Sequence, residues 1–285
     1  MDSKYIRRYF FIAGVRVCIS GSRDCLFEDA GLLAPFETEE GPADHELYCE
    51  VTETFAQPEG ILMYSDSERR VYCKDGVYTS CIGHPDAPYI RVERKGKTHF
   101  ARFSKRGLGG KISAKAALAA LEVENMISQE NGLLLHAAWI AHDNGAILFT
   151  APSGTGKSTQ AELWRQHRGA EVINGDRAMI RFAKDGAHAV GIPFCGSSRI
   201  SKNCCLPIRA VVYLSQAPHN RISSLEGVTA FRRIWEGCSV HTWNREDVAK
   251  AVDGVQKLIS TVPVYHLECR PEEGAVSALE AVLYP

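Results

Sequence analysis

The pattern of hydrophobic and polar positions divides the chain into two parts. In residues 1–110 the apolar residues occur in short, often alternating runs, with the turn signals Asp75-Gly76 and Lys95-Gly96 between them. This pattern predicts an antiparallel meander that forms a β-rich N-terminal domain. The expected strands cover residues 9–17, 47–51, 60–64, 70–73, 77–81, 89–93 and 98–103.

A helical pattern follows this β-rich part. Residues 36–45 are acidic and contain a proline, so we expect a loop there, and the adjacent glycines in 105–110 indicate a linker. From 113 to 129 the alanine- and leucine-rich sequence has an apolar face at helical spacing, and Ser113 can cap it. We therefore place the domain boundary before this helix and expect a second domain over 111–285.

The second domain alternates strands and helices, which is typical of an α/β nucleotide-binding fold. Apolar runs at 133–141 and 146–150 are joined by a segment that contains Asn144-Gly145, a strong hairpin signal. A helix is expected after the second run and should end at Gly169. Further strands are expected at 171–173, 178–182, 190–194, 210–214 and 264–268, and further helices at 229–236, 245–260 and 272–283.

The segment between the second apolar run and the helix has the pattern of a phosphate-binding loop. Gly154 and Gly156 let backbone N–H groups turn toward phosphate oxygens, Lys157 can reach the β- and γ-phosphates, and Ser158 can offer its hydroxyl to Mg²⁺. Ala151 stands where this pattern usually begins with glycine. The chain is therefore expected to bind ATP with Mg²⁺. The expected nucleotide-binding residues are Ala151, Pro152, Ser153, Gly154, Thr155, Gly156, Lys157, Ser158 and Thr159.

Two further residues are candidates for the chemistry. Asp176 follows the strand expected at 171–173, whose end should approach the phosphates if that strand lies alongside the one before the loop and is parallel to it. A carboxylate there can hold Mg²⁺ or accept a proton, or it can simply be a turn residue. His136 lies in the first apolar run, where it is either a general base or a hydrogen-bonded core histidine.

Composition narrows the class of protein. Of the 285 residues 45% are apolar, which is enough for a buried core. The 33 basic and 34 acidic residues nearly cancel, so no net electrostatic field attracts the chain to nucleic acid or to an anionic membrane. The ten cysteines include no C-x-x-C pair, which favours reduced thiols and a cytoplasmic protein over a disulfide scaffold. No run has membrane-spanning length. A homo-oligomer is left open.

From His136 to Arg181 the sequence resembles the HPr kinase/phosphorylase family, including the related serine kinases of lasso-peptide clusters. The resemblance consists of the histidine before a tight hairpin, the strand and loop at 147–159, and the turn Gly175-Asp176-Arg177. It implies a P-loop kinase domain of the HPr kinase/phosphoenolpyruvate carboxykinase type. It also implies transfer of phosphate from ATP to a protein serine. The family usually has two acids in the turn, the first resembling the base, whereas here Gly175 takes that position. The family's phosphorolysis signature has no counterpart.

The expected activity is thus an ATP- and Mg²⁺-dependent kinase for a serine of a protein or peptide. The catalytic candidates are His136, Asp176 and Lys157, with Ser158 and Asp176 as metal ligands, and the base is either His136 or Asp176. A kinase for a small hydroxylated metabolite and a nucleotide-binding regulator without turnover remain alternatives. The segment around the strand expected at 190–194 is rich in glycines, hydroxyl groups and cations, which would allow the phosphate acceptor to approach and would neutralise the transferred group. We therefore expect the acceptor to bind on this side of the site. Its candidate residues are Arg177, Gly196, Ser197, Ser198, Arg199 and Lys202.

Overall fold

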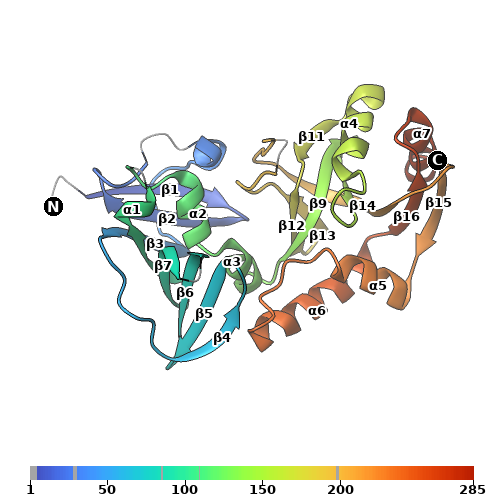
Figure 1. The fold of residues 1–285 in the computed structure, drawn as a ribbon. Coiled ribbons are helices and arrows are strands. Elements are labelled where there is room, and N and C mark those ends of the chain that lie inside the picture. The colour runs from blue at the N-terminus through green and yellow to red at the C-terminus, as the bar shows by residue number, and fades with distance from the viewer. Residues whose placement is uncertain (1–4, 28–30, 85, 109, 197–198) are drawn as a thin grey trace. The chain divides into compact units, whose positions relative to one another are not determined.

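The protein is a mixed α/β chain with two β-sheets, seen in a computed structural model that describes residues 5–27, 31–84, 86–108, 110–196 and 199–285. It divides into two compact units, Met1–Met126 and Ile127–Pro285, each with one of the sheets (Figure 1). Within the described segments, every helix is too short or too polar to reach across a lipid bilayer.

The first unit is built on an eight-stranded sheet in the order β1-β2-β3-β8-β7-β6-β5-β4. Its strands are β1 (Tyr5–Ile12), β2 (Val15–Ser22), β3 (His45–Thr52), β4 (Ile61–Ser65), β5 (Arg69–Lys74), β6 (Val77–His84), β7 (Ala87–Lys95) and β8 (Thr98–Ser104). Its helices are the 3₁₀ helix η1 (Gly31–Phe36), α1 (Lys105–Leu108), α2 (Ala114–Ala120) and the start of α3 (Val123–Gln129). Helix α2 lies against β3, β7 and η1.

The expected meander is confirmed from β4 to β8, where neighbouring strands are antiparallel. It is wrong for β3, which pairs in parallel with both β2 and β8, because the loop after β2 returns the chain to the starting edge. The single strand expected over 9–17 is also wrong. Ala13 and Gly14 adopt φ values of 56° and 85° and form a two-residue turn between β1 and β2.

The helix expected over 113–129 is interrupted. Ser113 caps α2 by accepting a hydrogen bond from the Ala116 N–H, as its sequence position predicts. Glu122 then adopts φ 48°, which ends the first helix before α3 begins. The Glu122 carboxylate is buried, accepts a hydrogen bond from Ser80 and forms an ion pair with Arg94, so side-chain contacts stabilise this break.

The second unit contains the other sheet, in the order β10-β9-β12-β13-β14-β16-β15, with β11 paired to β9. Its strands are β9 (Leu133–His142), β10 (Gly145–Thr150), β11 (Glu171–Asn174), β12 (Arg177–Ala183), β13 (Gly186–Val190), β14 (Cys205–Gln216), β15 (Arg221–Leu225) and β16 (Val264–Cys269). Its complete helices are α4 (Lys157–Arg168), α5 (Gly227–Trp235), α6 (Arg245–Thr261) and α7 (Glu273–Leu283).

The long strand β14 changes partners along its length. Residues 205–207 pair with β13, whereas residues 208–213 pair in parallel with β10. The strands β10, β9, β12, β13 and β14 therefore close on themselves. The strand expected at 190–194 is wrong, because β13 ends at Val190, and β15 was not expected from the sequence.

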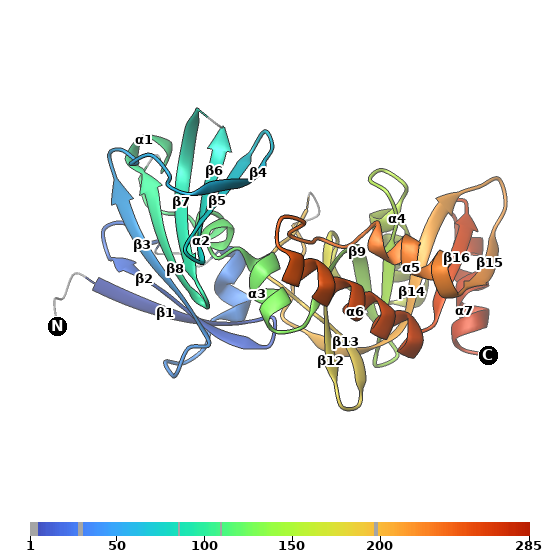
Figure 2. The same cartoon turned by 90° about the horizontal axis from the view of Figure 1, so that it is seen from below.

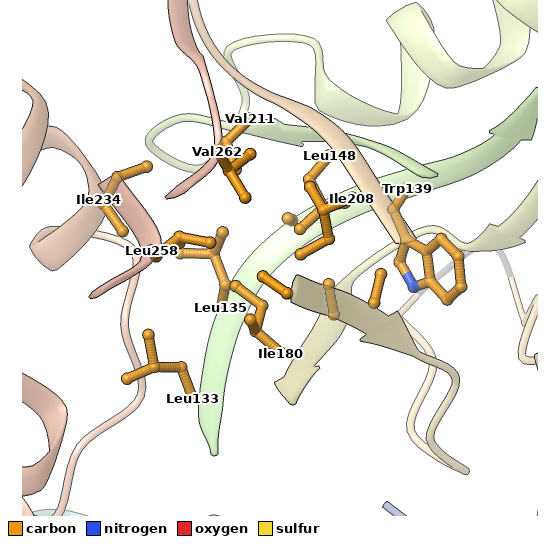
Figure 3. Close-up of a cluster of buried hydrophobic side chains, with 14 of the residues drawn as sticks. Leu133, Leu135, Trp139, Leu148, Ile180, Ile208, Val211, Ile234, Leu258 and Val262 are labelled. Atoms are coloured by element: carbon orange, nitrogen blue, oxygen red, sulfur yellow. The ribbon is translucent and has the colours of Figure 1, made fainter. Parts of the chain in front are cut away.

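Two hydrophobic clusters fix the helices to this sheet. One contains apolar residues of α5 and α6 with Trp139 and neighbouring strand residues, as Figure 3 shows. The other contains Trp164 of α4 and the apolar face of α7. The two pairs of helices thus cover different parts of the sheet (Figure 2). Trp139 and Trp164 are both fully buried, so each makes a large contribution to packing.

Candidate active site

The loop with the predicted phosphate-binding pattern, residues 151–156, connects β10 to α4, and we call it the phosphate loop. Strand β10 is buried along its whole length, which fixes the start of the loop. Gly154 and Gly156 have φ values of 78° and 120°, and a Cβ at either position would meet no atom of the chain within 4 Å. Both glycines thus border open space in a conformation that other residues rarely adopt. Gly156 is the N-cap of α4 and provides no side-chain cap, so the first amides of the helix remain available to an anion.

Lys157 directly follows this loop, with only 7% of its surface exposed. Its Nζ donates hydrogen bonds to the carbonyl oxygens of Ala151, at 2.9 Å, and Pro152, at 3.3 Å. Burial lowers the pKa of the Lys157 ammonium, and the negative charge of Asp176 partly opposes that shift. The lysine is therefore held beside the loop by contacts that a phosphate oxygen could replace.

A buried asparagine shapes the turn that carries Asp176. Asn174 is 0% exposed, and its Oδ1 accepts hydrogen bonds from the backbone N–H groups of Asp176 and Arg177, both at 2.9 Å. Its Nδ2 donates to the carbonyl oxygens of Phe194, at 2.5 Å, and Ile192, at 3.4 Å. Asn174 thus connects the acidic turn to the segment after β13. Its position at the start of an Asn-Gly-Asp turn is a sequence signal from which this role could have been predicted.

The sequence argument expected β11 to lie alongside β10 and to run in the same direction. The direction is confirmed, but the expected neighbouring position is wrong, because β9 lies between the two strands and is antiparallel to both. Because β11 and β10 run in the same direction, the turn after β11 still reaches the phosphate loop. There the Ser158 hydroxyl donates a hydrogen bond to the Gly175 carbonyl at 3.2 Å. Asp176 and Ser158 then lie in the lining of one cavity.

His136 comes to the same place from β9. Its Nδ1 is 3.5 Å from Oδ1 of Asp176, and its strand position pairs with Arg177 of β12. Its backbone N–H donates to the Gly237 carbonyl at 2.7 Å, and its carbonyl accepts a hydrogen bond from the Thr150 hydroxyl at 3.1 Å. The histidine is therefore fixed by contacts with three separate segments.

Burial is the main cause that lowers the pKa of the His136 imidazole, and the positive charge of Lys157 lowers it further. The negative charge of Asp176 opposes both effects. The neutral imidazole is accordingly the dominant form at pH 7, and a neutral imidazole can accept a proton.

These residues surround a cavity of about 310 Å³, which we call the phosphate cavity. Its lining consists of His136, Ser153, Gly154, Gly156, Lys157, Ser158, Thr159, Gly175, Asp176 and Gly196. A cavity of about 550 Å³ borders the other side of the loop and is lined by Thr155, Gln160, Leu214 and residues near Arg270. The two volumes together are in the range of small-molecule sites.

The oxygen donors at the phosphate cavity decide whether Mg²⁺ fits there. Among the described residues, no group of three or more histidine, cysteine, aspartate or glutamate side chains is placed to hold a metal. Asp176 and the Ser158 hydroxyl offer oxygen ligands at the phosphate cavity. Since Mg²⁺ usually takes one or two protein oxygens and completes its shell with water and phosphate oxygens, this small set fits.

The residues expected on the acceptor side are only partly brought together. Gly196 lies beside Asp176, where an added Cβ would be 3.1 Å from the carboxyl group. Arg177 is 3.4 Å from the Asp176 carboxylate and donates to the Ser239 hydroxyl at 2.7 Å. Arg199 is exposed, and Lys202 forms an ion pair with Glu171. Ser197 and Ser198 lie outside the described residues.

Sequence reasoning missed Asn174, Thr150, Gly237 and Arg233 as residues of this region. Gly237 follows α5, far along the chain from β9, so only the tertiary fold brings it to His136. Arg233 is one of two adjacent arginines in the amphipathic α5, and no local pattern distinguishes it from Arg232.

Comparison with known proteins identifies the family of this chain. One solved structure similar to this chain is the HPr(Ser) kinase/phosphatase from Coxiella burnetii, at 13% identity over 53% of this chain and 87% of that one. The TM-score of 0.30 is too low for this likeness to support an argument. Among curated proteins none matches the chain. The family model described as "SynChlorMet cassette protein ScmC" matches residues 113–283, well over half of the 285 residues. The chain therefore belongs to the SynChlorMet cassette protein ScmC family.

Proposed function

We propose that this protein is an ATP- and Mg²⁺-dependent kinase with a P-loop kinase domain, and that it transfers the γ-phosphoryl group to a serine hydroxyl of a protein or peptide. One observation carries the proposal: Lys157, Ser158, Asp176 and His136 line a single cavity beside the glycine loop. Phosphoryl transfer depends mainly on positioning and charge neutralisation, and this set contains the groups needed for both.

Each residue has a distinct role in the proposed reaction. Lys157 and the loop amides bind the polyphosphate of ATP, while Asp176 and Ser158 hold Mg²⁺, which supplies charge neutralisation when bound. His136 accepts the proton of the serine hydroxyl. The serine oxygen forms a bond to the γ-phosphorus, the bond from that phosphorus to the β,γ-bridging oxygen breaks, and ADP leaves with the electron pair.

His136 is the better candidate for the base because its neighbour Asp176 is assigned to Mg²⁺. A carboxylate that binds Mg²⁺ is a poor proton acceptor, because the cation stabilises its charged form. The lowered pKa of His136 instead leaves its imidazole neutral at pH 7. The acid that the HPr kinase family usually has at the position of Gly175 is then not needed as the base.

Transfer of ³²P from labelled ATP to candidate acceptors tests the proposal. The first acceptors to try are proteins and peptides encoded beside this chain's own gene, because the family is described as part of a cassette. Lys157→Ala should abolish the transfer, since the buried ammonium is lost from the loop. Lys184→Ala, a change at an exposed lysine in the turn between β12 and β13, is the matched control and should leave it intact.

The same assay separates the other two functions. Transfer to small hydroxylated metabolites but to no peptide would replace the proposal with a metabolite kinase. Lys157-dependent ATP binding without transfer to any acceptor would indicate a nucleotide-binding regulator. Transfer that is unchanged in Lys157→Ala would exclude the site altogether.

A further inference from the structure

A second cavity borders His136. It has a volume of about 320 Å³ and is lined by His136 and Thr150, the first residues of the phosphate loop, Tyr213 of β14, and Arg233, Glu236 and Gly237 at the end of α5. We call it the α5 cavity. His136 and Ser153 belong to the lining of both this cavity and the phosphate cavity. A group in the α5 cavity can therefore contact the histidine that also borders the proposed phosphate site.

Arg233 gives the α5 cavity its chemical character. Its guanidinium carbon lies 4.6 Å from the centre of the Tyr213 ring, and Tyr213 is almost fully buried in the sheet. This stacking holds the guanidinium plane against a fixed wall. Nη1 of Arg233 is 3.3 Å from the Glu236 carboxylate, a contact that engages one nitrogen of a group with five N–H donors.

Arg233 is the basic residue of the cavity lining and Glu236 is the acidic one, with 3.3 Å between them. The exposed Arg232 lies outside this lining and approaches the same carboxylate at 3.9 Å. The guanidinium of Arg233 is therefore the group of the lining that can bind an anion. An anionic ligand is favoured over a neutral or cationic one.

We propose that the α5 cavity receives the phosphate acceptor, and that Arg233 positions it by binding a carboxylate next to the acceptor serine. This inference rests on the kinase function proposed above. The hydroxyl then faces His136, while ATP occupies the phosphate cavity, which shares His136 and Ser153 with the α5 cavity. Because the cavity is small, the carboxylate and the hydroxyl must belong to neighbouring residues. The preferred acceptor is therefore a serine directly followed or preceded by aspartate or glutamate.

Two synthetic peptides that differ in one group test this inference: acetyl-Gly-Ser-Asp-Gly-amide and acetyl-Gly-Ser-Asn-Gly-amide. For the wild-type protein, kcat/KM of phosphoserine formation should be at least about tenfold higher for the aspartate peptide, as expected for one charge-assisted hydrogen bond. Arg233→Gln should remove this preference while KM for ATP changes less than about twofold. Arg232→Gln is the matched control, because Arg232 is 67% exposed and contacts the same glutamate, and it should keep the preference.

Three results would overturn the inference: equal use of both peptides by the wild type, a preference retained in Arg233→Gln, or an equal loss of preference in Arg232→Gln. If neither peptide is phosphorylated although ATP binding depends on Lys157, the acidic acceptor is rejected and the nucleotide site stands. Absence of ATP binding would instead reject the kinase function itself. Should Arg233→Gln fail to fold by circular dichroism, Arg233→Lys decides: it keeps the charge but loses the planar guanidinium, so the preference for the aspartate peptide must fall, and an unchanged preference would overturn the inference.

Discussion

The contacts of Asn174 permit a quantitative prediction about the acidic turn. Asn174→Ala removes the side chain that accepts hydrogen bonds from two backbone N–H groups and donates to two carbonyl oxygens. Three of these bonds have distances between 2.5 and 2.9 Å, and the fourth, to Ile192, is longer at 3.4 Å. Because Asn174 is fully buried, water cannot easily replace the lost partners.

The magnitude follows from counting the well-formed bonds. At about 1 kcal/mol for each of the three shorter bonds, Asn174→Ala should lower the free energy of unfolding of the second unit by about 3 kcal/mol. That is a large part of the roughly 5–15 kcal/mol that stabilises a typical domain. The displaced turn should also misplace the Asp176 carboxylate, so a higher Mg²⁺ concentration should be needed for ATP binding.

Tryptophan fluorescence during urea unfolding measures this effect on the correct unit. The chain has four tryptophans, at positions 139, 164, 235 and 243, and all of them lie within Ile127–Pro285. Asn220→Ala is the matched control. Asn220 also bonds one backbone N–H and one further group, but in exposed surroundings, so its loss should cost well under about 1 kcal/mol.

Equal destabilisation by Asn174→Ala and Asn220→Ala would refute the reasoning, because burial would then not decide the cost. A loss of about 3 kcal/mol without any change in the Mg²⁺ requirement would separate the stability of the turn from the position of Asp176. In that case Asp176 would have to be removed from the proposed metal ligands.

Other predictions concern the site residues and one buried histidine. His136→Ala should slow phosphate transfer by about 100-fold or more with little effect on ATP affinity, and equal losses in both would make His136 a packing residue. Since its pKa lies below 6.5, the wild-type rate should persist as the pH falls through 6.5 and decline only at lower pH, whereas a decline centred at or above 6.5 would contradict the assignment. Asp176→Asn should change which divalent cations support transfer, and an unaltered metal profile would exclude it as a ligand. Gly156→Ala should strain the loop by about 1–3 kcal/mol and weaken ATP binding, whereas Gly169→Ala, also at positive φ, should spare binding; equal affinities would refute this. Burial lowers the pKa of His99 to about 4, so between pH 6.5 and 4 the unfolded chain takes up a proton that the folded first unit does not, and the stability of that unit should fall by about 3 kcal/mol. Hydrogen-exchange protection factors of that unit, corrected for the pH dependence of exchange in an unfolded chain, should therefore fall, and unchanged protection factors would contradict this.

The sequence predicted the elements whose signals are local. The hairpin before the phosphate loop is confirmed, although its two central residues are Asp143 and Asn144 rather than Asn144 and Gly145. The turn at Asp75-Gly76 is confirmed at the expected residues, with φ values of 52° and 76°. Left-handed turn residues can be identified from residue type alone, because few side chains tolerate that conformation.

Features that depend on distant contacts were not predictable in this way. The parallel pairing of β3 with β2 and β8 is determined by which surfaces the whole first unit buries, and the runs themselves do not indicate it. The break between α2 and α3 at Glu122 is stabilised by Arg94, which lies on strand β7. Likewise, Arg233 becomes part of a cavity only because α5 ends beside His136 and Tyr213.

The exchange of partners by β14 has a consequence for the backbone hydrogen bonds of the second unit. Pro207 is the last residue of β14 opposite β13, where it faces His188, and Ile208 is the first opposite β10. A proline has no N–H, so Pro207 cannot donate a backbone hydrogen bond to β13 at the position where that pairing ends. The change of partner on β14, from β13 to β10, thus coincides with the residue that cannot donate a backbone hydrogen bond. Residues 208–213 of β14, which pair with β10, all have a backbone N–H, so β10, the strand that leads into the glycine loop, meets the part of β14 that can form a complete ladder.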